Sequence, residues 1–222
     1  MSAEWLLVCR KDLLVEVRTK TLVRQVLPFV VGNVFIFAFA LDTDSPTLRS
    51  VSGGVFWSAL FFAAVLLVSH NAALERQHRI SDGLRLTNLS PLSIYVGKTV
   101  AVCLQLVAVA ATLVVAIGVL YGTSISDVAA VALSVLLGVV AMSASGVTFG
   151  AIAATVRGRQ TVLALLYLPV MAPVLLCGSR VVSIAVGRSV GSTWPWIGLL
   201  TVFALATVGL GSLTYRPLLE HT

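Results

Sequence analysis

Six long runs of apolar residues dominate the sequence, and each is long enough to cross a lipid bilayer as a helix. About 20 mostly apolar residues span the hydrocarbon layer. The runs cover residues 22–41, 51–71, 99–120, 128–156, 161–177 and 194–215. They are solid rather than alternating, which favours helices over the strands of a membrane barrel. We therefore expect an all-α, polytopic membrane protein with six transmembrane helices.

The amino-acid composition supports this class and argues against a nucleic-acid-binding protein. Hydrophobic residues make up 58 % of the chain and charged residues only 11 %, whereas about a quarter of a soluble domain is charged. In a soluble domain, a net charge of +6 would suggest nucleic-acid binding as a function. Here the basic residues lie between apolar runs, and no basic surface interleaved with aromatic residues is present. We expect contact with the lipid bilayer and no nucleic acid.

The distribution of Lys and Arg between the two ends of the runs predicts the orientation in the membrane. Twelve of the fifteen basic residues fall in the N-terminal segment, the second and fourth connections and the C-terminal segment. The other side holds three, which are Arg49, Arg180 and Arg188. Because basic residues accumulate on the cytoplasmic side, we expect both termini in the cytoplasm of a multi-pass protein of the cell (inner, cytoplasmic) membrane.

The segment before the first run predicts a separate amphipathic helix. Leu6, Cys9, Leu13 and Val17 recur at helical spacing. The charged residues Glu4, Lys11 and Arg18 fall on the opposite face. We expect residues 1–21 to form a cytoplasmic amphipathic helix on the membrane surface, and residues 22–222 to form a six-helix transmembrane domain. The alternative is a soluble helix packed on a partner.

The polar connection over residues 72–98 contains the pattern of a short helix. Ser81 or Asp82 can accept the free amide protons of a first helical turn, and Ser90-Pro91 would end the helix. Leucines between them offer apolar contacts, while flanking arginines could instead lie on lipid headgroups. We expect a cytoplasmic coupling helix that contacts another protein. Its candidate docking residues are Arg79, Asp82, Gly83, Leu84, Leu86, Leu89 and Pro91.

Residue patterns that carry catalysis or bind nucleotides are missing from the sequence. It contains no Walker-type loop, no H-E-x-x-H, no G-x-S-x-G and no C-x-x-C-H. The middles of the six runs hold no ionisable residue, which argues against a proton path. Asn33 and Gln105 are expected to bond between helices. His70 could ligate a metal or a haem iron, or simply lie at the interface. We expect no catalytic residue, no metal site and an energy source in a partner.

Two features of the later runs concern helix packing. Gly146 and Gly150 form a ladder of small residues with Ala154, which lets another helix approach closely. The ladder fits either an internal helix contact or a dimer seam. Pro169 and Pro173 remove backbone hydrogen bonds from the fifth run, which predicts either a structural kink or a bend that lines a cavity.

Three stretches together resemble the heme exporter protein B (CcmB) family, one of the six-helix ABC-2 type permeases, which acts in cytochrome c maturation. The first is KDLLVEVRTK, with Lys11, Asp12, Leu13, Glu16 and Arg18. The second is the connection through Glu75, Asp82, Gly83, Leu89, Pro91, Gly97 and Lys98. The third is RGR followed by LPVMAP, with Arg157, Gly158, Arg159, Pro169 and Pro173. The likeness covers nearly the whole chain.

The resemblance implies a mechanism and a set of partners. A separate CcmA-like subunit would bind and hydrolyse ATP, and its motion would enter the membrane through the coupling helix at residues 80–91, with the N-terminal helix beside it. Further partners would be a CcmC-like haem-handling membrane protein and a CcmE-like haem chaperone. The chain itself would bind no cofactor, haem would be the candidate cargo, and the chain would act as a homodimer or beside a second membrane subunit.

Two other functions share most of these sequence features. One is an ABC-2 permease that exports another hydrophobic cargo. The other is a non-transporting membrane scaffold that uses ATP hydrolysis in a partner to release a haem-loaded chaperone. The sequence contains no ligand-binding residues that would separate them.

Overall fold

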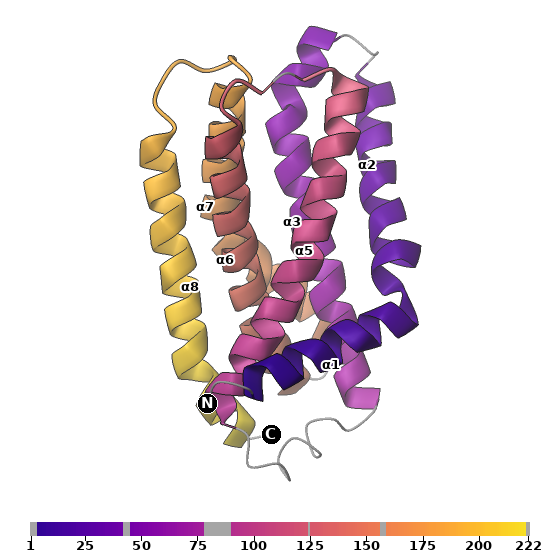
Figure 1. Cartoon of the computed structure of the whole chain (residues 1–222), viewed down its shortest axis with the longest axis vertical. Helices are drawn as coiled ribbons and strands as arrows, with labels where there is room; N and C mark the ends of the chain where they lie inside the picture. The colour runs from indigo at the N-terminus through magenta and orange to yellow at the C-terminus, as the bar shows by residue number, and fades with distance from the viewer. Residues whose placement is uncertain (1–3, 42–44, 78–89, 124, 156–158, 221–222) are drawn as a thin grey trace.

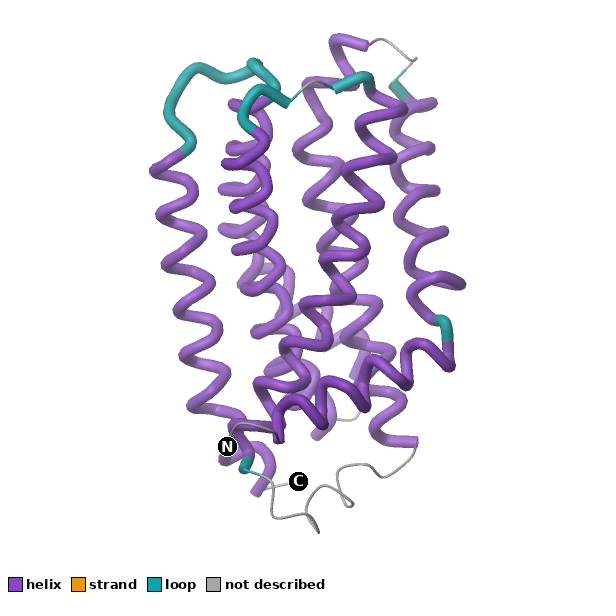
Figure 2. Tube along the Cα trace, viewed as in Figure 1, coloured by secondary structure: helices purple, strands orange, loops and turns teal. Residues whose placement is uncertain are grey.

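The computed structural model describes residues 4–41, 45–77, 90–123, 125–155 and 159–220. All regular structure in these ranges is helical, and no strand occurs in them (Figure 2). The helices are α1 (Glu4–Thr19), the π-helical turn η1 (Leu22–Val26), α2 (Leu27–Ala40), α3 (Ser45–Gln77), α5 (Pro91–Tyr121), α6 (Val128–Thr155), α7 (Arg159–Ala185) and α8 (Trp194–Glu220).

The expected six transmembrane helices are confirmed. Six helical segments of the described chain are long and apolar enough to cross a membrane. They run up and down as one bundle, while α1 lies across the end that carries both termini (Figure 1). Of the most apolar 18-residue stretch of α3, 67 % is buried inside the protein, whereas the corresponding share is 22 % in the first and last spans. Helix α3 is therefore the centre of the bundle, and the first and last spans expose most of their apolar side chains.

The connection between the second and third spans is shorter than the expected loop over residues 72–98. Helix α3 continues to Gln77, and α5 already begins at Pro91. The physical reason lies in Ser90, whose hydroxyl oxygen accepts the Ser93 amide proton at 3.3 Å. A capped serine followed by proline is a helix start, since proline lacks only an amide proton that the first turn leaves unpaired. Pro91 thus begins a transmembrane helix.

The fifth span extends further than the sequence predicts. Helix α7 passes Cys177 and Arg180 and ends at Ala185. Arg180 is exposed close to this end of the helix, where a long side chain can reach the membrane surface. Pro169 is exposed and Pro173 half-buried, and α7 remains one helix across both.

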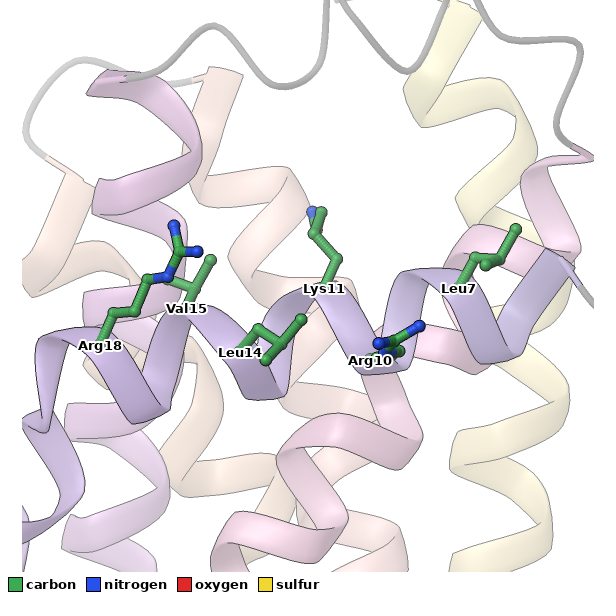
Figure 3. Close-up of a pocket in the computed structure, with 6 residues that line it drawn as sticks. All are labelled: Leu7, Arg10, Lys11, Leu14, Val15 and Arg18. Atoms are coloured by element: carbon green, nitrogen blue, oxygen red, sulfur yellow. The ribbon is translucent and has the colours of Figure 1, made fainter.

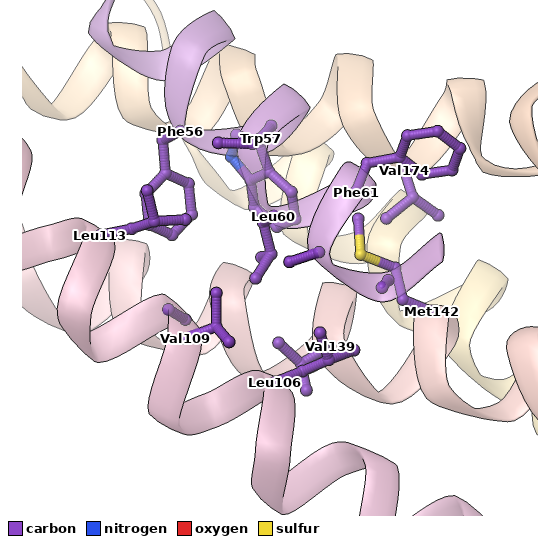
Figure 4. Close-up of a cluster of buried hydrophobic side chains, with 14 of the residues drawn as sticks. Phe56, Trp57, Leu60, Phe61, Leu106, Val109, Leu113, Val139, Met142 and Val174 are labelled. Atoms are coloured by element: carbon purple, nitrogen blue, oxygen red, sulfur yellow. The ribbon is translucent and has the colours of Figure 1, made fainter. Parts of the chain in front are cut away.

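The bundle core is built where α3 meets α5, α6 and α7. Aromatic side chains of α3 lie against aliphatic side chains of the other three helices (Figure 4). The indole of Trp57 is 1 % exposed, and a Cβ placed on either Gly138 or Gly178 would overlap it. Glycine at both positions therefore allows α6 and α7 to close around the largest side chain of the core, because tight packing is what holds helices together in lipid.

Substituting Gly178 with alanine tests this packing. The new methyl group would overlap the Trp57 ring, so we expect Gly178→Ala to lower the free energy of unfolding by about 1–3 kcal/mol. The measurement is thermal unfolding of the purified protein in detergent. Gly118→Ala is the matched control, because nothing lies within 4 Å of a Cβ at Gly118. Equal melting temperatures for both variants would contradict the assignment.

Candidate functional site

Helix α1 packs directly on the first turns of α5. A Cβ built on Gly97 would lie 2.6 Å from the carbonyl oxygen of Trp5 and 2.7 Å from the Cβ of Val8. Only glycine permits so close an approach of two helix backbones. Gly97 therefore fixes where α1 crosses α5, at the end of the bundle that carries the termini (Figure 1).

The side of α1 that faces the bundle differs from the predicted apolar face. Val8 and Cys9 are buried, whereas Leu6 and Val17 are 55 % and 68 % exposed. The predicted stripe is thus divided between the protein and the outer surface. The physical reason is the close approach at Gly97, which brings the backbone of Trp5 and the side chain of Val8 against α5 and so fixes which face of α1 is buried.

Each carboxylate of α1 has a defined partner. Glu4 accepts a hydrogen bond from the Ser90 hydroxyl at 3.4 Å, and Asp12 pairs with the Lys11 ammonium at 2.9 Å. Glu16 Oε1 accepts the Leu22 amide proton at 2.6 Å. The Glu16 bond spans the elbow, the turn at Lys20 where the chain leaves α1. Lys20 adopts a φ of +54°, which costs free energy in a residue with a side chain, and the Glu16 bond stabilises this turn.

The two ends of α1 contact the two helices that flank the connection at residues 78–90. At the start of α1, Glu4 bonds to Ser90, the N-cap of α5. Just after α1, the Thr21 hydroxyl lies 2.8 Å from Nε2 of His70, on α3. The helices on both sides of this connection therefore contact α1 or the residues just after it.

The beginning of α5 also contacts the later spans. The rings of Tyr95 and Tyr215 are 5.3 Å apart, and the Tyr95 hydroxyl donates to the Ala144 carbonyl at 3.4 Å. The Lys98 ammonium lies 6.0 Å from the centre of the Tyr215 ring. The first two turns of α5 thus join α1, α6 and α8. We call this junction the α5 hub, defined by Ser90, Tyr95, Gly97 and Lys98.

Of the candidate docking residues in the connection, the structure describes one. Pro91 is the first residue of α5. The remaining six lie outside the described residues: Arg79, Asp82, Gly83, Leu84, Leu86 and Leu89. In the motif of the N-terminal helix, Lys11, Asp12 and Glu16 have the contacts given above, and Arg18 is exposed.

The described residues do not assemble a metal site. No group of three or more His, Cys, Asp or Glu side chains comes together in the described ranges. His70 shares its Nε2 with the Thr21 hydroxyl. Burial, and then the charge of Asp12, raises the pKa of the Cys9 thiol. Since a metal or haem iron binds the thiolate, the Cys9 thiol is not prepared as a ligand in this conformation.

Polar and small residues inside the spans have mainly internal contacts. A Cβ on Gly146 would lie 2.7 Å from Val68, and one on Gly150 would lie 3.2 Å from the same side chain, so this ladder faces α3 of the same chain. The side-chain oxygens of Asn33 and Gln105 are buried without a hydrogen-bond partner in the described part of the chain. Among the described residues, these two oxygens therefore form no interhelical hydrogen bond.

Several residues of this region escape sequence reasoning. Thr21, His70 and Tyr95 carry no motif, and their roles depend on residues 49 positions or more away along the chain. Gly97 is different, because it stands in the Gly-Lys pair that ends the polar connection. A glycine in the second turn of a helix, just before an apolar run, is the available sequence signal for a helix crossing.

Six spans in one bundle, preceded by a helix across their ends, define an all-α multi-pass membrane protein. The chain belongs to the CcmB family: the family model described as "CcmB protein" matches residues 3–221. This is the heme exporter protein B family, so the protein has a permease-type role in haem export for c-type cytochrome biogenesis. Membership implies association with other Ccm components at the level of the family. No curated protein sequence matches the chain.

The contact at Gly97 can be tested through Cys9. A leucine at position 97 would push α1 off α5, and the Cys9 thiol, 5 % exposed in the structure, would become accessible. In a background with Cys103 and Cys177 replaced by alanine, we expect maleimide labelling of Cys9 to rise at least about tenfold in Gly97→Leu. Gly118→Leu is the control, since its position is open. Slow labelling in both variants would show that α1 does not depend on Gly97.

Proposed function

We propose that this protein is the transmembrane subunit of an ATP-driven complex that delivers haem for c-type cytochrome assembly. A separate CcmA-like subunit binds and hydrolyses ATP, and this chain carries the conformational change into the membrane. Haem is the cargo or the released product, and the chain holds no resident cofactor. The observation that carries the proposal is the family match over residues 3–221.

The packing of the α5 hub supports a route for the coupling. A partner that moves residues 78–90 would act on α5 through Ser90 and on α1 through the bond from Ser90 to Glu4. From α1 the motion would enter the first span through the elbow at Lys20, and from Tyr95 it would enter α6 and α8. Rigid helices with two arrangements are the usual means of such transmission.

The proposed complex has two ATPase copies and two permease-type chains, because two ATPase docking surfaces are needed. The second chain is another copy of this protein or a different membrane subunit. A CcmC-like membrane protein and a CcmE-like chaperone receive the haem. The termini and α1 lie in the cytoplasm, in line with the basic residues at that end of the bundle.

Deletion of the gene, followed by a haem stain of the membranes, tests the proposal. We expect the c-type cytochromes to disappear and the b-type cytochromes to stay, because only c-type assembly needs haem delivered by this complex. The wild-type gene should restore the bands. Unchanged c-type cytochromes in a strain that makes them would favour a permease for another hydrophobic cargo. Haem flux in vesicles then separates transport from release of a haem-loaded chaperone.

Aspartate at Leu84 and Leu89 tests the proposed coupling helix. Two charges in place of its apolar contacts should prevent the variant gene from restoring the c-type cytochromes of the deletion strain, while the protein still inserts into the membrane. The readouts are the haem stain, ATP hydrolysis by the purified complex and co-purification of the ATPase subunit. Val190→Asp is the control, because Val190 is fully exposed at the opposite end of the bundle. Full activity together with retained ATPase would refute the docking assignment.

A further inference from the structure

The outward face of α1 forms an open groove of about 310 Å³ in which leucines alternate with basic residues. It is lined by Leu7, Arg10, Lys11, Leu14, Val15 and Arg18. Leu7 and Leu14 are 59 % and 48 % exposed. In Figure 3, Leu14 and Arg10 lie on the near face of the helix, and Lys11 extends away from the helix axis. Neither the packing of α1 nor the proposed coupling uses this face.

The charges of α1 are sorted between its two sides. The three carboxylates have partners: Glu4 at Ser90, Asp12 at Lys11 and Glu16 at Leu22. Arg10 and Arg18, in contrast, form no ion pair with any described residue, and both are exposed. The exposed Lys20 and Arg24 continue the basic surface past the elbow. The groove therefore presents uncompensated positive charge, which fits an anionic ligand.

The depth of α1 in the bilayer identifies the class of ligand. The part of α5 between Gly97, where α1 crosses, and Tyr121 is about 36 Å long at the rise of an α-helix. The hydrocarbon layer is about 30 Å thick. Helix α1 therefore lies at the level of the lipid headgroups, where exposed leucines meet the upper acyl carbons and arginines meet phosphates.

We propose that the groove binds the headgroup of an anionic phospholipid from the adjacent leaflet. Arg10 and Arg18 donate hydrogen bonds to the phosphate, since the planar guanidinium fits two phosphate oxygens at once. Leu7 and Leu14 cover the glycerol and the first acyl carbons. Lys11 contributes less, because its ammonium already pairs with Asp12. The proposal concerns a lipid site and does not depend on the haem role.

Native mass spectrometry of the full chain in detergent, titrated with phosphatidylglycerol, measures the site. We expect the double variant Arg10→Gln, Arg18→Gln to bind phosphatidylglycerol about 25-fold more weakly, at about fivefold for each basic residue at a membrane surface. The control double variant is Arg180→Gln, Arg188→Gln, which removes two exposed arginines from the opposite end. It should bind the lipid as the wild type does, and phosphatidylcholine should bind weakly to every form.

Further variants distinguish a lipid groove from other uses of the surface. Leu7→Ser with Leu14→Ser should also weaken binding, because the acyl contacts are lost, and millimolar inorganic phosphate should not displace the lipid. Both groove variants should keep Cys9 protected from maleimide, since their side chains face away from the bundle. Unchanged affinity in the arginine variant, or an equal loss in the control, would overturn the proposal. Loss of the ATPase subunit with lipid binding intact would reassign the groove to protein docking.

Discussion

In the hydrocarbon layer no water is present to bond the backbone, so each span must satisfy its own amides as a helix and gain its stability from close packing. The contact of Trp57 with Gly138 and Gly178 shows how this chain meets that condition. Side-chain hydroxyls follow the same rule, since Ser143 donates to Val139 and Thr207 to Phe203 within their own helices. Most hydroxyls of the spans thus bond within their own helix, while a few join helices, such as Tyr167, which donates to the Met142 carbonyl at 2.6 Å.

At the end that carries the termini, the arrangement changes from packing to directed polar contacts. Helix α1 lies on Gly97 and bonds to Ser90 at one end, and the residue that follows the elbow bonds to His70. These contacts join the start of the first span to both helices that flank residues 78–90. The proposed ATPase partner would act at this surface, because the interior of the bundle is apolar and closed by packing. Family membership and this connection point in the same direction.

Much of the architecture could be predicted from apolar run length alone. The six spans and the all-α class follow from it, because hydrocarbon allows one solution for a solid apolar run. The N-terminal helix follows instead from the helical spacing of its apolar residues. The ends of the spans were less predictable. The sequence pattern predicts that Ser90 and Pro91 end a helix, yet the same pair is a strong helix start. Only the contacts of the residues that follow, Ser93 and Tyr95, decide between the two. The sequence predicts that the fifth span ends before Arg180, yet α7 continues past it, because an arginine near a helix end can extend its charged group to water.

The sequence by itself determined that this chain crosses the membrane as six helices, and its motifs were sufficient to indicate the CcmB family. These properties depend on composition and on short local patterns. Tertiary structure alone decided which face of α1 turns inward, that Gly97 and Trp57 are the tight contacts, and that Thr21 meets His70. Those outcomes depend on partners far apart along the chain, where helix spacing predicts a face but not which helix will cover it. The exposure of Leu7 and Arg10 belongs to the same group, since only the packing of α1 shows that this basic side faces away from the bundle.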